Sequence, residues 1–379
     1  MTTTDLGPTQ LDSTQAEPAT TEPSPTEMLA GRLFSTGVGA VELCTVYLGV
    51  HLGLYRELDD SPATAAELAT RTGCDERYLR EWLQAQAVSG LLDVDGLDPS
   101  TARFALADGT HDVLVDETSP AYLGGLPDVL AATGSVLPLL VDAYRTGAGV
   151  PYAAYGPDAV TGQSALNRPA FVNALVTDWL PHLPDVLARL VDTTRPARVA
   201  DLGCGAGWAA IELAKAFPHI RVDGRDNDEA SIALGRRNAV DHGVADRVDL
   251  EVVDLADETA DWSPRYDLAL FVECVHDFPR PVEALRHARS AVRPGGTVLV
   301  VDQRAAETFT APGDEVERFF AAAGAVWCVP QGRVGPDPEP VGTLIRPDTV
   351  RELAGRAGYA GVDIVPIEHP FWRFYRLTP

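Results

Sequence analysis

Hydrophobic residues recur at two different spacings along this chain, and the spacing changes near residue 196. Before that point apolar positions repeat every three to four residues, as Leu29, Leu33 and Cys44 do within residues 28–58. This spacing is typical of amphipathic helices. After that point short runs of Val, Ala and Leu alternate with helical segments. Such alternation with short connections predicts βαβ units and a parallel sheet.

The first half of the chain contains a compact pattern between residues 63 and 106. We predict a helix over 63–70, a turn, a helix capped by Asp75 that ends near Ser89, and strands over 91–94 and 103–106. This order is the outline of a winged helix. Helical segments follow to about residue 143 and, after a Gly-, Pro- and Tyr-rich loop at 147–162, over 169–191. Residues 121–141 predict a pair of buried helices rather than a membrane span.

The second half predicts an α/β fold with a parallel sheet. Its expected strands are 199–202, 221–225, 248–253, 267–274 and 297–301, and its expected helices are 208–217, 229–242 and 281–292. An aromatic and Gly/Pro-rich insertion at 303–345 interrupts the alternation, and a helix at 347–357 with two strands, 361–367 and 373–377, ends the chain. We therefore divide the chain into 1–27, 28–118, 119–194 and 195–379.

Composition and charge exclude several classes of protein. The 379 residues carry 30 basic and 55 acidic side chains, a net charge of −25 that repels nucleic acids and anionic membranes. The five cysteines form no CxxC pair, which favours a reducing cytoplasm over a disulfide scaffold. Residues 1–27 are rich in Thr, Pro and Glu, without the basic and apolar regions of a secretory signal, and predict a disordered tail.

A glycine-rich turn follows the first strand predicted in the second half and contains candidate ligand-binding residues. The strand ends in Asp201, and Gly203, Gly205 and Gly207 alternate before the helix. Trp208 stands where the last glycine of a nicotinamide or flavin fingerprint belongs, and the G-K-[ST] of a P-loop is absent. Bare backbone amides in such a turn lie close to a ligand.

Two acidic residues at the ends of the next strands support a nucleotide-like ligand. Asp226 ends the second strand, where its carboxylate can accept hydrogen bonds from both hydroxyls of a ribose, and Asp254 ends the third. D-x-G-x-G-x-G resembles the loop of class I S-adenosylmethionine-dependent methyltransferases. The resemblance implies a Rossmann-like seven-stranded sheet ending in a reversed hairpin, and S-adenosylmethionine as cofactor with S-adenosylhomocysteine as product. The implied cofactor-binding residues are Asp201, Gly203, Gly205, Asp226, Asn227, Asp254, Leu255 and Glu273.

A histidine follows the fourth predicted strand, where ligands of open α/β sheets bind. His276-Asp-Phe278 resembles the H-[DN]-W stretch of plant caffeate-type and bacterial polyketide O-methyltransferases, whose histidine is the general base. A histidine suits a base at neutral pH because of its ordinary pKa. Phe278 departs from the Trp of that family, and His276 as a cap of the next helix is the alternative. The histidines show no metal-ligand spacing, so we predict no metal site.

Charge also decides how the winged helix is interpreted. Residues 59–117 contain thirteen acids and four arginines, a net charge of −9 that opposes DNA binding. The resemblance to these O-methyltransferase families implies that the winged-helix-like domain forms a homodimer. Runs such as Asn167-Arg-Pro-Ala-Phe171 look like those of actinobacterial methyltransferases.

The function predicted from the sequence is methyl transfer from S-adenosylmethionine to a small molecule, with a hydroxyl of a secondary metabolite as the leading acceptor and His276 as base. The alternatives are a carbon or nitrogen acceptor that needs no base, and a cofactor-binding transcriptional regulator. Four aromatic residues are candidates for the acceptor site: Tyr155, Trp179, Phe320 and Trp327. The insertion 303–345 is a candidate lid.

Overall fold

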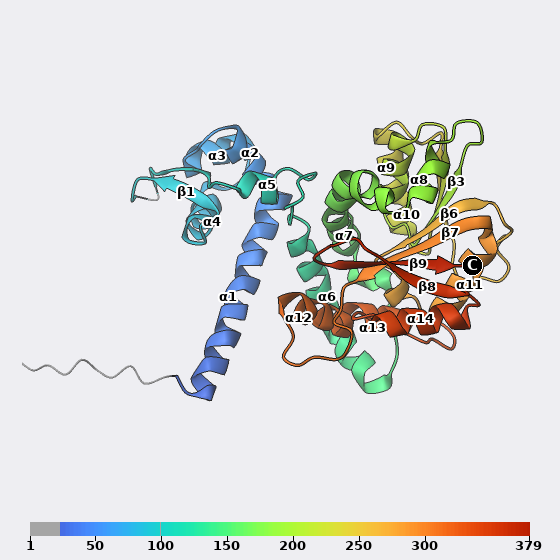
Figure 1. The fold of residues 1–379 in the computed structure, drawn as a ribbon. Coiled ribbons are helices and arrows are strands. Elements are labelled where there is room, and N and C mark those ends of the chain that lie inside the picture. Colours follow the sequence, from blue (N-terminus) through green and yellow to red (C-terminus); the bar gives the residue numbers. More distant parts are fainter. Residues whose placement is uncertain (1–22, 99) are drawn as a thin grey trace, which may run out of the picture. The chain divides into compact units, whose positions relative to one another are not determined.

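The computed structural model describes residues 23–98 and 100–379, so most of the predicted tail lies outside the described residues. Contacts divide the chain into a short unit that ends at Glu42 and a compact unit, Leu43–Pro379. Helix α1, Pro25–His51, belongs to both (Figure 1). The helical pattern expected over 28–58 is confirmed, but two helices share it, because Gly53 adopts a left-handed conformation (φ 68°) and a new helix, α2 (Leu54–Asp60), begins after it.

The predicted winged helix is present at the start of the compact unit. It contains α3 (Ala65–Thr72), α4 (Glu76–Val88), β1 (Leu92–Asp95), β2 (Arg103–Leu106) and α5 (Thr110–Leu114), and β1 pairs antiparallel with β2. Local sequence sets the helix starts. Thr64 and Glu67 form a reciprocal capping box, and the Asp75 carboxylate accepts from the amides of Arg77 and Tyr78.

A helical connector follows: α6 (Leu126–Thr146), η1 (Tyr152–Tyr155), α7 (Pro157–Ala170), the π-helix η2 (Phe171–Trp179), η3 (Leu180–His182) and α8 (Pro184–Val191). The pair of buried helices predicted over 121–141 is wrong: α6 is one helix with exposed Leu137, Leu139 and Val141. By length and composition alone α1 and α6 could span a membrane, a test that core helices and signal sequences also pass. The predicted loop 147–162 ends early, at Pro157.

The second half of the chain forms the predicted parallel sheet. Within the described residues its strands are β3 (Arg198–Leu202), β4 (Arg221–Asp226), β5 (Val248–Val252), β6 (Tyr266–Val272), β7 (Val292–Gln303), β8 (Gly361–Val365) and β9 (Trp372–Thr378). Their order is β5-β4-β3-β6-β7-β9-β8, and β9 runs antiparallel to both neighbours. This is the reversed hairpin implied by the methyltransferase resemblance.

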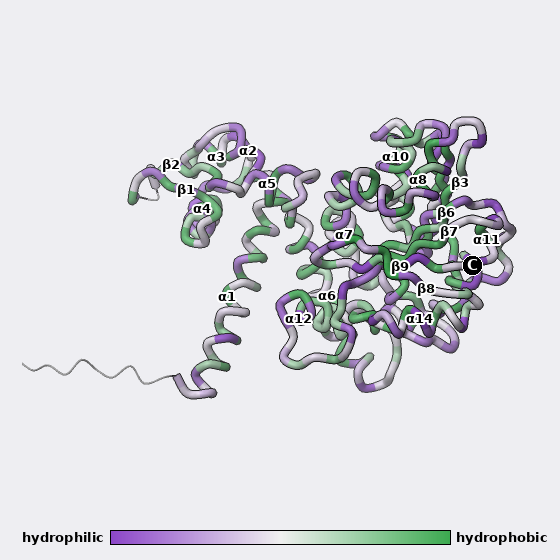
Figure 2. Tube along the Cα trace, viewed as in Figure 1, coloured by the Kyte–Doolittle hydropathy of each residue, from purple (hydrophilic) through white to green (hydrophobic). Residues whose placement is uncertain are grey.

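Helices cover both faces of this sheet. The helices between strands are α9 (Trp208–Ala216), α10 (Glu229–Asp241), α11 (Pro281–Ala291) and α14 (Pro347–Arg356). Alternate strand residues point to opposite faces: Val199 joins the core with α8 and α9, whereas Ala200 joins the core with α11 and α14. Figure 2 shows the hydrophobic strands β3, β6 and β7 inside this region.

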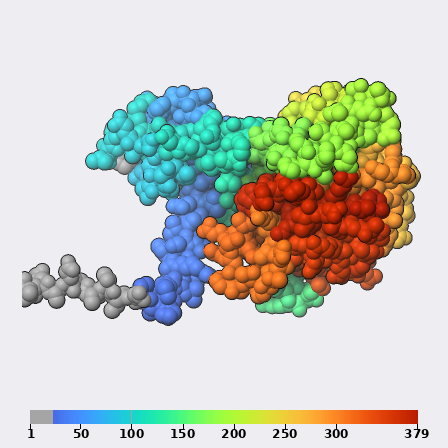
Figure 3. Space-filling view, in the orientation of Figure 1, coloured from blue at the N-terminus to red at the C-terminus, as the bar shows by residue number. Residues whose placement is uncertain are grey.

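The insertion folds into α12 (Glu315–Ala323), a second π-helix η5 (Gly324–Cys328) and α13 (Val329–Gly332). It is hydrogen-bonded to the connector, since the Tyr155 hydroxyl donates to Val326 O at 2.8 Å and Val150 N donates to Pro330 O at 2.9 Å. Figure 3 shows the insertion, in orange, beside the C-terminal strands in red. These hydrogen bonds hold the connector and the insertion together.

Candidate active site

A cavity of about 490 Å³ lies at the carboxyl ends of β3, β4 and β6. The eight residues expected to contact a cofactor all line it: Asp201, Gly203, Gly205, Asp226, Asn227, Asp254, Leu255 and Glu273. They come from four separate segments of the sequence, and the parallel sheet brings them together because the carboxyl ends of its strands share one edge. The connector and the insertion supply the opposite wall.

The glycine-rich turn has backbone geometry that only glycine adopts without strain. Gly203, Gly205 and Gly207 have φ angles of 76°, 50° and 77°, all in the left-handed region. A Cβ on Gly203 would stand 2.7 Å from Cys274 Sγ, and one on Gly207 would stand 3.1 Å from Leu250 Cδ1. A ligand can therefore approach the bare backbone of this turn closely.

Carboxylates at the strand ends hold the turn in place. Asp226 Oδ2 accepts from Gly205 N at 2.8 Å, and its Oδ1 accepts from Asp228 N at 2.9 Å. Asp201 Oδ2 accepts from Ala210 N at 3.2 Å in the first turn of α9, and burial raises the pKa of Asp201 to about 7. Each carboxylate has about four lone-pair positions, so Asp226 keeps capacity for ligand hydroxyls.

The remaining predicted cofactor residues differ in exposure. Asp254 is exposed and accepts from Ala256 N at 2.8 Å, and Leu255 is buried. Asn227 is exposed at the rim. Glu273 has a φ of 52°, rare for a residue other than glycine, and desolvation by the surrounding protein raises its pKa to about 7. A strained backbone beside a cavity is typical of functional sites.

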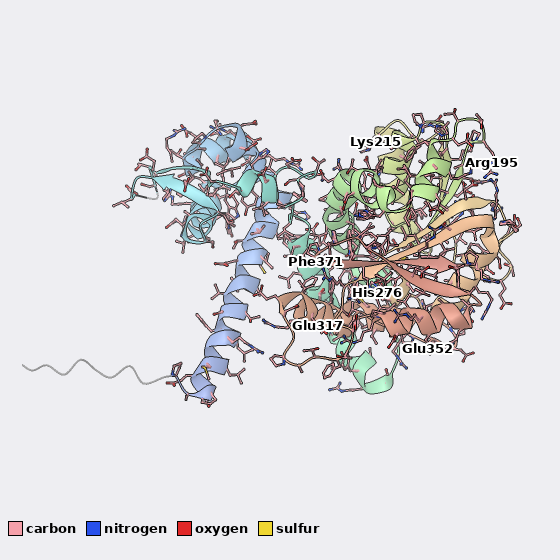
Figure 4. The ribbon with its side chains drawn as sticks, viewed as in Figure 1. Arg195, Lys215, His276, Glu317, Glu352 and Phe371 are labelled. Carbon is pink, nitrogen blue, oxygen red and sulfur yellow. The ribbon has the colours of Figure 1, made fainter. Side chains whose placement is uncertain are left out.

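His276 lies beside the cavity but does not line it. Its side chain is 3% exposed, and Figure 4 labels it in the α/β half of the chain. Nδ1 lies 2.6 Å from Oδ1 of the fully buried Asp302, and Nε2 lies 3.4 Å from Asp277 Oδ1. Burial by itself lowers the pKa of His276, but the Asp277 and Asp302 carboxylates outweigh it, so the pKa lies well above the ordinary histidine value. The expectation that this imidazole faces the cavity is not met.

The four aromatic candidates for the acceptor site separate into two groups. Trp327 lines the cavity from the π-helix η5. Tyr155 instead packs behind Trp327, with ring centroids 4.6 Å apart. Trp179 is fully buried in the core among Phe171, Trp372 and Phe374, and Phe320 packs in the insertion against Phe319 and Phe371. Tyr155, Trp179 and Phe320 do not line the cavity, because aromatic side chains at helical spacing fill the cores of their segments.

Sequence reasoning missed several lining residues, and most of them come from the connector and the insertion. They are Tyr152, Gln163, Ser164, Asn167, Phe171 and Gln331, and Trp208 at the start of α9 joins them. One signal was available: the run Asn167 to Phe171 was singled out for its resemblance to other methyltransferases, without a role. Which side of a connector helix faces the sheet depends on packing that this run does not encode.

His276 is one of three possible metal ligands that lie close together. His276, Asp277 and Cys328 place their ligand atoms within 4.8 Å of one another. Burial raises the pKa of the Cys328 thiol to about 12, which opposes the thiolate form that binds metals. The prediction that the protein holds no metal stays a prediction.

Comparisons with known proteins agree with this architecture. A family model for a methyltransferase domain matches residues 200–298, and a model for an Rv2258c-like winged HTH domain matches residues 40–114. The tetracenomycin polyketide synthesis 8-O-methyl transferase TcmO of Streptomyces glaucescens is 30% identical over 268 residues, which cover 67% of this chain and 73% of TcmO. The chain belongs to the class I S-adenosylmethionine-dependent methyltransferases with an N-terminal winged-helix domain.

Other proteins similar to this methyltransferase are also named methyltransferases. The mitomycin biosynthesis 6-O-methyltransferase of Streptomyces lavendulae is 27% identical over 269 residues, 70% of this chain and 74% of the relative. The solved structure of the mitomycin 7-O-methyltransferase MmcR has a TM-score of 0.64 at 20% identity, covering 94% of this chain and 99% of that one. Human N-acetylserotonin methyltransferase with bound S-adenosylmethionine has a TM-score of 0.67 at 16% identity, with coverage of 94% and 99%. These structures share the fold of the methyltransferase described here.

Proposed function

We propose that this methyltransferase transfers the methyl group of S-adenosylmethionine to a hydroxyl of a secondary metabolite, with His276 as general base. The relatives TcmO and the mitomycin 6-O-methyltransferase, whose names place them in polyketide and mitomycin biosynthesis, support the acceptor class. The observation that carries the proposal is the buried contact of 2.6 Å between His276 and Asp302, because the neighbouring Asp277 lines the cavity that contains the glycine-rich loop.

The residues of the cavity fit the cofactor. Gly203 and Gly205 would lie against it, because both line the cavity and a Cβ on Gly205 would point into open space. Asp226 would accept from the ribose hydroxyls, and Asp254 with the neighbouring Leu255 would contact the adenine. Asp201, Asn227 and Glu273 complete the wall.

The proposed chemistry needs the protein to orient the acceptor and to remove one proton. The cofactor supplies an activated methyl group on a positively charged sulfur. Nε2 of His276 takes the proton of the acceptor hydroxyl as its oxygen bonds to the methyl carbon, whose bond to sulfur breaks. Asp302 keeps Nδ1 protonated and stabilises the imidazolium that forms, which makes it a positioning residue.

Access to His276 requires the insertion to act as a lid. Cys328 and Asp277 lie next to the imidazole, and Trp327 from the same π-helix lines the cavity. We propose that acceptor binding moves this π-helix, so that Nε2 reaches the acceptor. π-helical turns often occur at functional sites, which supports a role for this segment.

We also propose that the protein is a cytoplasmic homodimer that does not bind nucleic acid. Between Pro25 and Glu42, α1 exposes large apolar side chains that a second copy would cover: Met28, Leu29, Leu33, Phe34, Val38 and Val41. On α4, Arg77 and Arg80 are already paired with Glu81 and Glu76, which leaves no net positive charge for DNA. Replacing Leu33 and Phe34 with Glu should give a monomer in size-exclusion chromatography with light scattering. A dimer of unchanged affinity would contradict this interface.

The test of the proposed function is a methylation assay with a panel of phenolic, alcohol and amine acceptors, monitored by formation of S-adenosylhomocysteine. Wild-type protein should methylate a hydroxyl acceptor, and His276→Ala should lower kcat by about a hundredfold or more while binding the cofactor normally. If His276→Ala keeps most of the rate on a hydroxyl acceptor, His276 is not the base; turnover of amine acceptors alone would instead favour a nitrogen acceptor that needs no base. If wild-type protein does not bind S-adenosylmethionine, the proposal fails altogether.

A further inference from the structure

Arg168 contacts both the start of the cofactor-binding helix and the end of the winged-helix region. Its guanidinium carbon lies 4.4 Å from the centroid of the Trp208 ring, a cation–π contact. Its Nη1 donates to Glu117 Oε2 at 2.9 Å. Glu117 Oε1 in turn accepts from Arg56 Nη2 on α2 at 2.5 Å. A continuous set of contacts therefore runs from α2, which precedes the winged helix, through Glu117 and Arg168 to Trp208.

Trp208 is the residue through which this set of contacts reaches the cavity. It is the first residue of α9, directly after Gly207, and it lines the cavity with only 7% of its surface exposed. Its indole Nε1 donates to Ser164 Oγ at 2.8 Å. Ser164 and Arg168 are four residues apart on α7, so one face of that helix holds the indole at two points.

The position of Trp208 affects the backbone amides that face a ligand. The first amides of a helix have no partner within the helix, and those of α9 follow the glycine-rich turn. A shift of the indole would move the start of α9 together with Gly205 and Gly207, because only Ala206 and Gly207 lie between Gly205 and Trp208. The strength of the contact also depends on Arg168 staying over the ring, and Glu117 holds it there.

We propose that Arg168 is a positioning residue for cofactor binding, which couples Glu117 and Arg56 of the winged-helix region to the glycine-rich loop through Trp208. This inference rests on the proposed cofactor contacts of that loop. It also gives a role to the run Asn167 to Phe171, in which Asn167 and Phe171 line the cavity and Arg168 holds Trp208.

The experiment measures the affinity of the full-length protein for S-adenosylmethionine and S-adenosylhomocysteine by calorimetry. Arg168→Gln should weaken both ligands by about tenfold, and Glu117→Gln by about threefold, because the loop and not the sulfonium is displaced. Arg168→Lys, which keeps the charge but loses the planar stacking group, should lie between wild type and Arg168→Gln. Glu81→Gln, which breaks the exposed Arg77–Glu81 pair on α4, is the matched control and should change neither affinity.

A double mutant separates coupling from a general loss of stability. If Glu117 acts through Arg168, Glu117→Gln should add nothing to the affinity loss of Arg168→Gln. The thermal midpoint should fall no more in Glu117→Gln than in the Glu81→Gln control. Affinities in Arg168→Gln within about twofold of wild type, or additive losses in the double mutant, would overturn the inference. Should Arg168→Gln fail to fold, Arg168→Lys and Glu117→Gln decide in the same way. Absence of binding by the wild type would instead refute the proposed function.

Discussion

Replacing Asp226 with Asn tests the cofactor site most directly, because this carboxylate has two tasks. In the structure it accepts from the amides of Gly205 and Asp228 and so fixes the turn. We expect it also to accept from the two ribose hydroxyls. The Asn side chain keeps the shape but loses the charge. Its NH₂ group must face either a backbone amide, where a donor meets a donor, or the ribose hydroxyls, which then lose an acceptor.

The expected loss follows from these contacts. A hydrogen bond to a charged group contributes about 1.5–3 kcal/mol, and two of them to the ribose are weakened together. Because such losses are not additive, we expect about 2.8 kcal/mol, which is about a hundredfold in Kd for S-adenosylmethionine. The measurement is calorimetric titration. Asp249→Asn is the matched control, since this exposed carboxylate on the neighbouring strand β5 pairs with Arg225.

A second pair of ligands isolates the ribose contact. Wild-type protein should bind adenosine more tightly than 2′,3′-dideoxyadenosine, and Asp226→Asn should abolish that preference. The reasoning would be refuted if Asp226→Asn bound S-adenosylmethionine within about threefold of wild type with an unchanged circular dichroism spectrum, since about 0.6 kcal/mol is less than one such hydrogen bond.

Three further predictions concern the base, the turn and a metal. The raised pKa of His276 keeps it protonated to higher pH, so kcat should rise as pH increases through that pKa. Asp302→Asn should lower the pKa of His276, move this rise to lower pH and reduce the maximal rate. An unmoved pH profile would contradict the proposed pairing of His276 with Asp302. Gly203→Ala should destabilise the fold by about 1–3 kcal/mol more than Gly243→Ala in denaturant unfolding. Both glycines have a positive φ, but only a Cβ on Gly203 would meet another side chain, that of Cys274. Equal losses of stability would exclude this clash. Dialysis against EDTA should leave the rate unchanged, whereas a loss restored by Zn²⁺ would place a metal at His276, Asp277 and Cys328.

Much of the fold was predictable because its signals are local. The strands β3 to β6 begin and end within about two residues of their predicted positions, since short apolar runs bounded by turn residues encode buried parallel strands. The capping residues Thr64 and Asp75 likewise mark the helix starts of the winged helix. Where local signals were weak the predictions failed. The break between α1 and α2 was not predicted, because the helical spacing over 28–58 continues across Gly53 and does not reveal that its backbone turns left-handed.

The cofactor half of the site could be predicted because its residues follow strand ends in chain order. Asp201, Asp226 and Asp254 each occupy the same topological place on consecutive strands, and parallel strands bring those places together. The acceptor half could not be predicted in this way. Trp179 and Trp327 look alike in sequence, yet one is in the core and the other lines the cavity.

The sequence by itself determined the parallel sheet, the glycine-rich turn and the acids at the strand ends, because each depends on residues close together in the chain. Only the tertiary structure decided that Asp302 supports His276, that Cys328 and Asp277 enclose it, and that Arg168 links Glu117 to Trp208. The contacts of His276 with Asp302 and Cys328 join residues 26 and 52 positions apart, and that of Arg168 with Glu117 joins residues 51 positions apart. Their geometry depends on how helices and the insertion pack on the sheet, which no local pattern of residues specifies.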